Sequence, residues 1–321
     1  MQFFSKCYII ELAKYLENIS LLVKPKKKED EERIMYQVIF NPTAGKKKAK
    51  RALETVCRMF REQNVAFQVH QTAAVHDAET IARRLTNAGA NHLVVVGGDG
   101  TLHEVLNGIV EPSKCTLGLI PAGTGNDFAE AAGIPLDAAE AVKIILQRNA
   151  KPIDFLQVGD RRCMNVTGLG IDVQVLERCM RGKMKGKLKY LMSLIQTVFG
   201  YKGCKVCVQS DGVEETRDVL LAAACNGSQF GGGIRICPTA EIADGKISVV
   251  TVDCLGGIFK ILKAFMALMK GKILSFPATK YFLCDRVRIT TEQPCSVQLD
   301  GEIYSDLILD VQVGKGLKMY Y

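Results

Sequence analysis

The sequence predicts an α/β domain followed by an all-β domain, that is, a doubly wound parallel sheet and then a mainly antiparallel β domain. From residue 35 onward, strand-like and helix-like segments alternate, which is the order of a doubly wound sheet. After Pro152 short β-like runs predominate, separated by Gly, Asp and Asn, which is typical of an antiparallel β domain. The length of 321 residues fits two domains of roughly 100–200 residues each, and 48% hydrophobic residues exclude a disordered chain.

The first domain is expected over residues 35–155. Its strands are expected at 35–42, 66–72, 91–98 and 116–121, and its helices at 46–63, 76–89, 101–109, 127–133 and 136–148. The run at 91–98 is continuously apolar, as in a parallel strand that is buried on both faces. Because such sheets bind ligands beyond the carboxyl ends of their strands, we expect the site in the turns that follow these strands.

The second domain is expected over residues 156–305, and the segment 306–321 is expected to return to the first domain. Strand-like runs lie at 152–159, 163–168, 205–212, 218–227, 246–253, 286–291, 296–301 and 307–315. Helical interruptions are expected near 172–200 and 256–271. This order indicates a mainly antiparallel sheet with two helices inserted into it.

Residues 1–34 form an extension with an amphipathic helix and a charged linker. Apolar residues recur at helical spacing from Ile9 to Val23, but charged residues interrupt them, so the segment is neither a secretory signal nor a membrane span. A dispensable extension, a surface anchor and a packed accessory helix all fit it. No other window reaches the roughly 18 apolar residues that a span needs. We expect a cytoplasmic or peripheral protein whose twelve scattered Cys are reduced thiols.

Three glycine-rich turns follow strands of the first domain, at 41–50, 97–101 and 119–127. Glycines let the backbone approach a ligand, and amide groups at a helix start form an anion cradle. Asp99 and Asp127 lie within two of the turns. A carboxylate can lie close to phosphates when a Mg²⁺ ion between the two groups offsets their repulsion. None of the turns is a dinucleotide fingerprint or a Walker A loop. Together they favour a nucleotide site.

The motifs GGDGTLHEVLNG and PAGTGNDFA resemble the diacylglycerol kinase catalytic domain, a group that includes bacterial lipid kinases and sphingosine kinases. NPTAGKKKAK is similar to the opening turn of that family, and Thr72 with Asp77 and Ala78 is similar to a further element. GGGIRICPTAEIADGKISVV and QLDGE resemble the family's later Gly-rich and Asp-Gly-Glu stretches. The resemblance runs from about Met35 to the C-terminus and leaves residues 1–34 outside it.

The resemblance implies a two-domain lipid kinase with an NAD kinase-like α/β domain that binds ATP and a β-sandwich that binds the lipid. The implied ATP contacts are Asn41, Pro42, Thr43, Gly45, Thr72, Gly97, Gly98, Gly100, Thr101, Glu104, Gly123, Thr124 and Asn126. Glu302 is implied as the general base on the lipid hydroxyl, with Asp300 beside it and Asp99 as the third catalytic acid. An ordinary hairpin turn is the competing interpretation of Asp-Gly-Glu. His103 lies in the expected nucleotide helix, where a hydrogen-bonding role is plausible.

Two kinds of Mg²⁺ site follow from these residues. Asp99 and Asp127 are expected to hold the ion at the phosphates, directly or through water. Glu241, Asp244 and the backbone of Lys246 are implied by the resemblance as a structural Mg²⁺ site. A plain Asp-Gly hairpin explains the second set equally well.

The excess of Lys and Arg over Asp and Glu comes from two segments that contain no acidic residue. The formal net charge is +8, and eight Lys and Arg lie within 178–210 and five Lys within 254–284. In the second segment Lys260, Lys263 and Lys270 form one stripe of the expected helix, a pattern typical of an anionic membrane surface. A helix packed on the sheet with its lysines in solvent has the same pattern. No aromatic stacking platform accompanies the charge, so nucleic acid is not expected as a partner.

The function that the sequence favours is transfer of the γ-phosphate of ATP to diacylglycerol, with Mg²⁺, at the inner face of the membrane. Another lipid alcohol, such as a sphingoid base, ceramide or a polyprenol, stays open as the substrate. NAD kinase and a non-catalytic nucleotide-binding regulator are further alternatives. The late Asp-Gly-Glu and the basic apolar segments favour a lipid over NAD, and the intact acids argue against a regulator. A homodimer is possible on general grounds alone.

Overall fold

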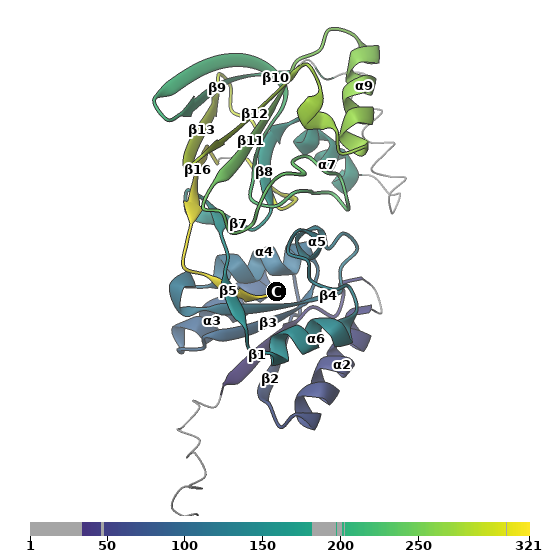
Figure 1. Cartoon of the computed structure of the whole chain (residues 1–321), viewed down its shortest axis with the longest axis vertical. Coiled ribbons are helices and arrows are strands. Elements are labelled where there is room, and N and C mark those ends of the chain that lie inside the picture. Colours follow the sequence, from purple (N-terminus) through teal and green to yellow (C-terminus); the bar gives the residue numbers. More distant parts are fainter. Residues whose placement is uncertain (1–33, 46–47, 182–196, 198–200, 202, 306) are drawn as a thin grey trace, which may run out of the picture. The chain divides into compact units, whose positions relative to one another are not determined.

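The computed structural model describes residues 34–45, 48–181, 197, 201, 203–305 and 307–321. These residues form two sheets with helices around them (Figure 1). The amphipathic helix expected within 1–34 lies outside the described residues, as does most of the basic, helical segment expected after Arg181. Among the described helices, none is long and apolar enough to cross a membrane.

The first sheet has six strands in the order β2-β1-β3-β4-β17-β5. Its strands are β1 (Met35–Phe40), β2 (Ala66–Gln71), β3 (His92–Gly97), β4 (Thr116–Pro121), β5 (Ala150–Pro152) and β17 (Lys318–Tyr320). Strands β1 to β4 pair in parallel, and β3 and β4 are almost wholly buried, as their apolar sequences predict. The α/β domain is therefore confirmed.

The helices of this domain occur where the sequence predicts them. They are α2 (Lys48–Glu62), α3 (Asp77–Asn87), α4 (Asp99–Gly108), α5 (Asp127–Ala131) and α6 (Ala138–Leu146), with a 3-10 turn at Pro112–Lys114. Helix α6 begins at Asp137, whose carboxylate accepts from the amides of Ala139 and Glu140. Helix α4 has no such side-chain cap, which matters for the site described below.

The second sheet has eleven strands, most of them antiparallel neighbours. They are β6 (Phe155–Val158), β7 (Arg161–Cys163), β8 (Val166–Gly170), β9 (Cys204–Ser210), β10 (Val213–Cys225), β11 (Ile247–Asp253), β12 (Thr279–Cys284), β13 (Arg286–Thr291), β14 (Val297–Leu299), β15 (Glu302–Tyr304) and β16 (Leu309–Gly314). Helices α7 (Ile171–Arg181) and α9 (Ile258–Met269) and a 3-10 turn at Ile273–Ser275 are inserted between strands, as expected.

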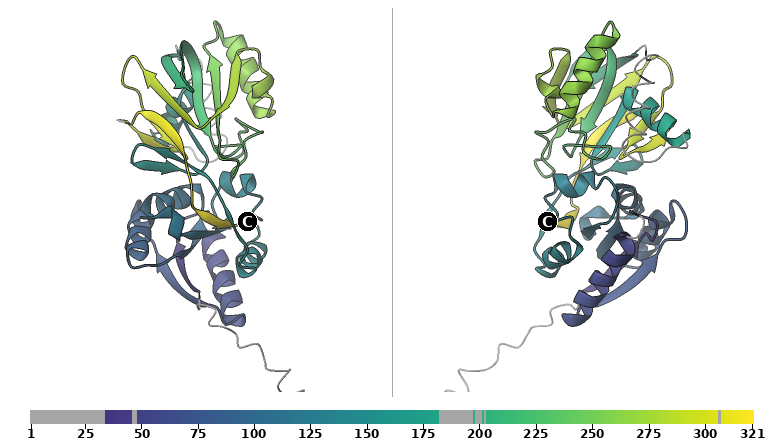
Figure 2. Two further views of the ribbon diagram at one scale, coloured as in Figure 1. Left: turned by 60° about the vertical axis from the view of Figure 1, so that its left-hand side comes forward. Right: turned by 90° about the vertical axis from the view of Figure 1, so that its right-hand side faces the viewer.

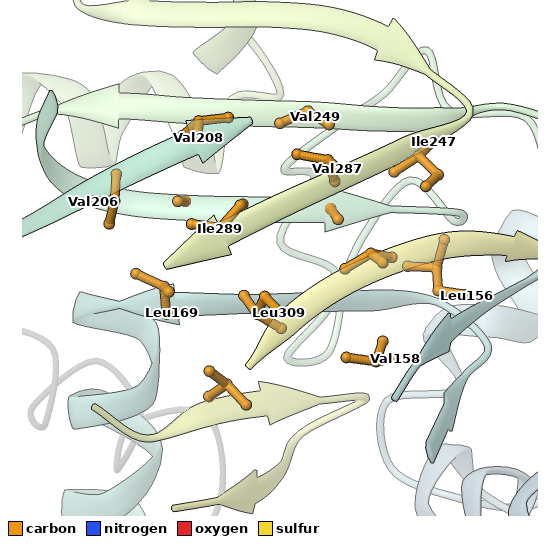
Figure 3. Packing of buried hydrophobic residues seen from close by; sticks show 14 of the residues in the cluster. Leu156, Val158, Leu169, Val206, Val208, Ile247, Val249, Val287, Ile289 and Leu309 are labelled. Carbon is orange, nitrogen blue, oxygen red and sulfur yellow. The ribbon is translucent and has the colours of Figure 1, made fainter. Parts of the chain in front are cut away.

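Strand β10 separates two hydrophobic cores because its side chains alternate between its faces. Ala222 and Ala224 belong to the core between the curled strands, where side chains of several strands converge (Figure 3). Ala223 and Cys225 belong to the other core, which α7 and α9 cover. The sandwich is thus one long sheet that folds over itself on one face and carries helices on the other.

The expectation that the whole segment 306–321 returns to the first domain is wrong for its first strand. Strand β16 pairs with β6 and β13 in the second sheet. Leu309 and Val311 on one face of the strand are fully buried in the core of this sheet, while Asp310 and Gln312 lie on the other face. Only β17 returns, in parallel with β4 and antiparallel to β5.

Candidate active site

The three glycine-rich turns pack against one another at the carboxyl edge of the first sheet. A Cβ on Gly123 would lie 2.5 Å from the Cα of Gly98, and a Cβ on Gly45 would lie 2.0 Å from the carbonyl oxygen of Ala122. Neither distance can accommodate a side chain. The amide of Ala122 also donates to the carbonyl oxygen of Gly97, at 2.7 Å. Glycine at these positions is therefore what allows the turns to meet.

Polar side chains tie the same turns together. The side-chain amide of Asn41 donates to Oγ1 of Thr101 at 3.0 Å, and the hydroxyl of Thr43 donates to Oδ1 of Asn41 at 2.8 Å. Oδ1 of Asn126 accepts from the backbone amide of Gly123 at 2.8 Å. With no side-chain cap on α4, the amides of its first turn stay available to an anion, which is the cradle that the sequence predicts.

The predicted nucleotide residues, with one exception, lie at this edge of the sheet. They are Asn41, Pro42, Thr43, Gly45, Thr72, Gly97, Gly98, Gly100, Thr101, Gly123, Thr124 and Asn126. The exception is Glu104, whose two carboxylate oxygens accept from the amides of His76 and Ala78, at 3.0 and 3.1 Å. Glu104 therefore caps the start of α3, and its contact with ATP stays a prediction.

The carboxylates of Asp99 and Asp127 both lie close to Gly125. A Cβ on Gly125 would lie 3.1 Å from Oδ2 of Asp99 and 3.2 Å from Oδ2 of Asp127. Burial raises the pKa of both carboxyls above the ordinary range, although backbone hydrogen bonds oppose the shift, and the charge of Asp99 raises the pKa of Asp127 further. Two close, buried carboxylates with hard oxygen donors fit a divalent cation such as Mg²⁺, which would relieve their repulsion.

Asp127 also connects the two domains. Its carboxylate accepts from the backbone amides of Gly232 and Gly233, at 2.8 and 2.7 Å, and from the side-chain amide of Gln229 at 3.2 Å. The sequence analysis assigned no role to these three residues. The run of three glycines at 231–233 was the available signal, since backbone amides can approach a carboxylate closely where no side chain intervenes.

Asp300 is the most heavily bonded acid of the site. It follows β14 in the left-handed region, with φ 51°. Its carboxylate accepts from the backbone amides of Met164 and Asn165, both at 2.8 Å, from the Cys163 thiol at 3.1 Å and from Nδ1 of His103 at 2.9 Å. Burial alone would raise the pKa of Asp300, but these hydrogen bonds and the charge of His103 hold that pKa below its ordinary value.

Glu302 begins β15, two residues after Asp300, and its side chain reaches the first turn of α4. Its Oε1 lies 3.7 Å from the position that a Cβ would take on Gly100, in the first turn of α4. The side chain is half-buried. The structure thus brings together Glu302, Asp300 and Asp99, the three acids that the sequence analysis selected for catalysis.

A cavity of about 330 Å³ is lined by three acids, Asp99, Asp127 and Asp300, and by apolar residues of both domains. Its lining includes Asp99, Asp127, Asp300, Thr124, Gly125, Gly231, Gly232, Gly301 and Asn165, and the apolar residues Leu102, Phe128, Met164, Val166, Leu176 and Phe230. The lining therefore combines acidic and apolar side chains. Such a lining suits an amphiphilic molecule with a polar end at the carboxylates.

The second predicted Mg²⁺ set does not join this cavity. Asp244 accepts from the amide of Lys246 at 2.9 Å, the ammonium of Lys246 pairs with Asp285 at 2.7 Å, and Glu241 is exposed. Asp154 lies at the same turn and accepts from the amide of Gly245 at 2.7 Å. Among the residues that the structure describes, no three His, Cys, Asp or Glu side chains are grouped to hold a metal. A structural Mg²⁺ here stays a prediction.

Comparison with known proteins agrees with this arrangement. Residues 35–158 match the diacylglycerol kinase catalytic domain, and residues 165–317 match the YegS C-terminal NAD kinase beta sandwich-like domain. The chain is 28% identical to a diacylglycerol kinase of Bacillus subtilis over 83% of this chain and 89% of that protein. It is 31% identical to a YegS-like lipid kinase of Pseudomonas putida over 80% of this chain and 86% of that protein.

A solved structure supports the fold. A diacylglycerol kinase of Bacillus anthracis superposes with a TM-score of 0.71 at 24% identity, over 90% of this chain and 97% of that chain. The fold, an α/β domain with a β-sandwich, is thereby confirmed. With both domains matched in order and the acids of the motifs gathered at one cavity, the chain belongs to the family of diacylglycerol kinases and YegS-like lipid kinases.

Proposed function

We propose that the protein transfers the γ-phosphate of ATP to the free hydroxyl of diacylglycerol, which gives phosphatidic acid and ADP. The observation that carries the proposal is the position of Glu302. Its carboxylate lies beside Gly100 in the first turn of α4, where the phosphates are expected, and the two residues before it, Asp300 and Gly301, line the cavity. A proton acceptor thus lies close to the expected phosphoryl donor, in the same turn as two residues of the expected acceptor site.

In the proposed step Glu302 takes the proton of the lipid hydroxyl as the new oxygen–phosphorus bond forms. The bond between the γ-phosphorus and the bridging oxygen breaks, and ADP leaves. Mg²⁺ at Asp99 and Asp127 would offset the charge of the phosphates. The unsatisfied amides at the start of α4 position the same charge, and Asp300 orients the turn that carries Glu302.

The apolar residues of the cavity lining favour a lipid over NAD as the acceptor. The lining includes Phe128, Met164 and Phe230, which suit the glycerol backbone and the first methylenes of an acyl chain. Polar groups of a dinucleotide would lose hydrogen bonds to water against these side chains. A different lipid alcohol remains the second candidate, since one relative is a YegS-like lipid kinase and the other a diacylglycerol kinase.

Labelled ATP tests the proposal directly. The purified full chain would be incubated with Mg²⁺ and with mixed micelles that each contain diacylglycerol, ceramide, sphingosine, monoacylglycerol or undecaprenol, with soluble NAD as a further acceptor. We expect label in phosphatidic acid only, and no transfer in the presence of a chelator. Label in another lipid would change the substrate, and label in NAD would overturn the lipid function.

A variant pair tests the role of Glu302. Glu302→Gln is expected to lower kcat on the order of 100- to 10,000-fold, the usual effect of removing a general base. Glu292→Gln is the matched control, because Glu292 is exposed and pairs with Lys205 away from the cavity. Equal turnover of the two variants would remove Glu302 from the mechanism.

A further inference from the structure

Helix α9 lies along the outside of the second sheet and buries one of its faces there (Figure 1; Figure 2). Ile261 and Ala264 are 7% and 3% exposed and belong to the core that contains Val250 and Val252. This contact anchors the helix to β10 and β11. The orientation of its other face is therefore determined.

The outer face of α9 is apolar. Phe259 is 78% exposed, Met269 52%, Met266 51% and Leu262 40%. Their spacing of three, four and three residues places them on one side of the helix. Single apolar residues at a surface are ordinary, but four large ones on one helix face indicate a surface that binds something.

Lysines flank these four residues. Lys260, Lys263, Lys270 and Lys272 are all exposed, and none of them has an ion-pair partner among the described residues. Other lysines of the same domain do pair with acids, for example Lys280 with Glu215. The segment 254–284 contains no Asp or Glu at all. The surface around the apolar face is therefore positively charged without local compensation.

We propose that this docking face, made of Phe259, Leu262, Met266, Met269 and the flanking Lys260, Lys263, Lys270 and Lys272, binds the surface of an anionic lipid bilayer. The apolar side chains would enter the boundary between headgroups and acyl chains, and the lysines would lie among the lipid phosphates. The charge favours a bilayer over a protein partner, because unpaired lysines around an apolar patch complement a continuous anionic surface. The proposal rests on the proposed lipid-kinase function only for the biological reason to meet a membrane.

The absence of Trp from the sequence allows a direct test of insertion. Phe259→Trp places a single indole on the docking face, and Leu136→Trp places one at a comparably exposed site, 64% exposed, in the first domain. With vesicles of phosphatidylcholine and phosphatidylglycerol, we expect the emission of the first variant to shift to shorter wavelength. The emission of the second variant should stay unchanged. No shift in Phe259→Trp with these vesicles would contradict insertion of the docking face.

Sedimentation with vesicles measures the contribution of each kind of residue. Lys263→Glu with Lys270→Glu is expected to weaken binding to anionic vesicles at least 25-fold, since each lysine contributes about fivefold near such a surface. Phe259→Ser with Met266→Ser should weaken binding at every salt concentration. Lys114→Glu and Leu136→Ser, two exposed positions in the first domain, are the matched controls and should bind as the unaltered protein does.

These outcomes separate the docking face from the kinase function, because vesicle binding needs neither ATP nor turnover. Binding that is lost in the α9 variants but not in the controls supports the proposal even if no lipid is phosphorylated. Equal binding by all variants, or no binding of the unaltered protein to anionic vesicles, would overturn it. An α9 variant that changes the oligomeric state without changing vesicle binding would also overturn it, in favour of contact between copies of the chain.

Discussion

Nδ1 of His103, in the helix that starts at the nucleotide turn, lies 2.9 Å from Oδ2 of Asp300, in the turn that carries the proposed base. Both side chains are 3% exposed. The other ring nitrogen of His103 faces the hydroxyl of Tyr304 at 3.0 Å. This pair therefore links the first turns of α4 to the Asp-Gly-Glu turn of the second domain.

We expect the carboxylate of Asp300 to stabilise the fold at neutral pH. Without it, the free energy of unfolding should fall less as the pH is lowered. Because its pKa is held below the ordinary 3.8, its contribution is fully present at neutral pH and is lost as the pH falls below about 4. Asp300→Asn places an amide against backbone donors and should lower the free energy of unfolding at pH 7 by about 1–3 kcal/mol. Urea unfolding at pH 7 and at about pH 2.5, below the range in which the contribution is lost, measures both effects, with exposed Asp160→Asn as the control. An unchanged pH dependence in Asp300→Asn would contradict the assignment.

Replacing Asp99, in contrast to replacing Asp300, should not destabilise the fold. Burial raises the pKa of Asp99, so folding disfavours its charged form. Asp99→Asn retains an oxygen that can accept from the amide of Phe128, now 3.1 Å from Oδ1 of Asp99. We expect a melting temperature that is unchanged or higher, together with loss of transfer. A clear fall in melting temperature would show that the carboxylate is needed for folding rather than for the reaction.

His103 is expected to act as a positioning residue through Asp300. His103→Leu removes the donor to Asp300, so the pKa of Asp300 should rise and the acid limb of the pH–rate profile should move to higher pH. Because Asn41, Thr101 and the glycine turns are unaffected, KM for ATP should change less than kcat. Tyr304→Phe is the comparison, since it keeps the contact of His103 with Asp300. Equal profiles for all three proteins would exclude this role.

Much of the first domain could be predicted because its signals are local. The apolar run of β3 and each glycine turn consist of consecutive residues, so they can be recognised directly in the sequence. Because the strands are parallel, the turns that follow them lie at one edge of the sheet. The strand LDVQVG was read correctly as a strand but placed in the wrong sheet. Alternation shows that one face of a strand is buried, but it does not show against which partner.

Contacts between distant residues could not be predicted. Nothing near Glu104 indicates that it caps α3, because the amides it accepts from lie more than twenty residues earlier. The same is true of Asp127 and the amides of Gly232 and Gly233, which are more than a hundred residues apart. The sequence also could not show that Phe259 and Met266 are exposed, since a helix with apolar residues on several sides can bury any of them.

The contact between Gly123 and Gly98 predicts a selective loss of nucleotide binding. A Cβ on residue 123 would lie 2.5 Å from the Cα of Gly98 and 2.9 Å from Oδ1 of Asn126, so Gly123→Ala must separate the two turns. We expect KM for ATP to rise at least tenfold, since small misplacements of positioning groups have large effects. Gly256→Ala is the control, because a Cβ there meets nothing within 4 Å. Equal KM values for the two variants would mean that ATP does not contact this pair of turns.

Asp127 is predicted to have two separable effects, one on the contact between the domains and one on the metal. Asp127→Asn keeps one side-chain oxygen, which can accept from only one of the backbone amides of Gly232 and Gly233. Its NH2 group faces the other backbone amide, so that hydrogen bond is lost. We therefore expect these amides to exchange hydrogen faster. If Asp127 also holds Mg²⁺, the Mg²⁺ concentration for half-maximal transfer should rise as well. Glu130→Gln, one turn further along α5 and likewise bonded to Gln229, is the matched control. Faster exchange with an unchanged Mg²⁺ requirement would leave Asp127 as a structural link and assign the cation to Asp99 alone.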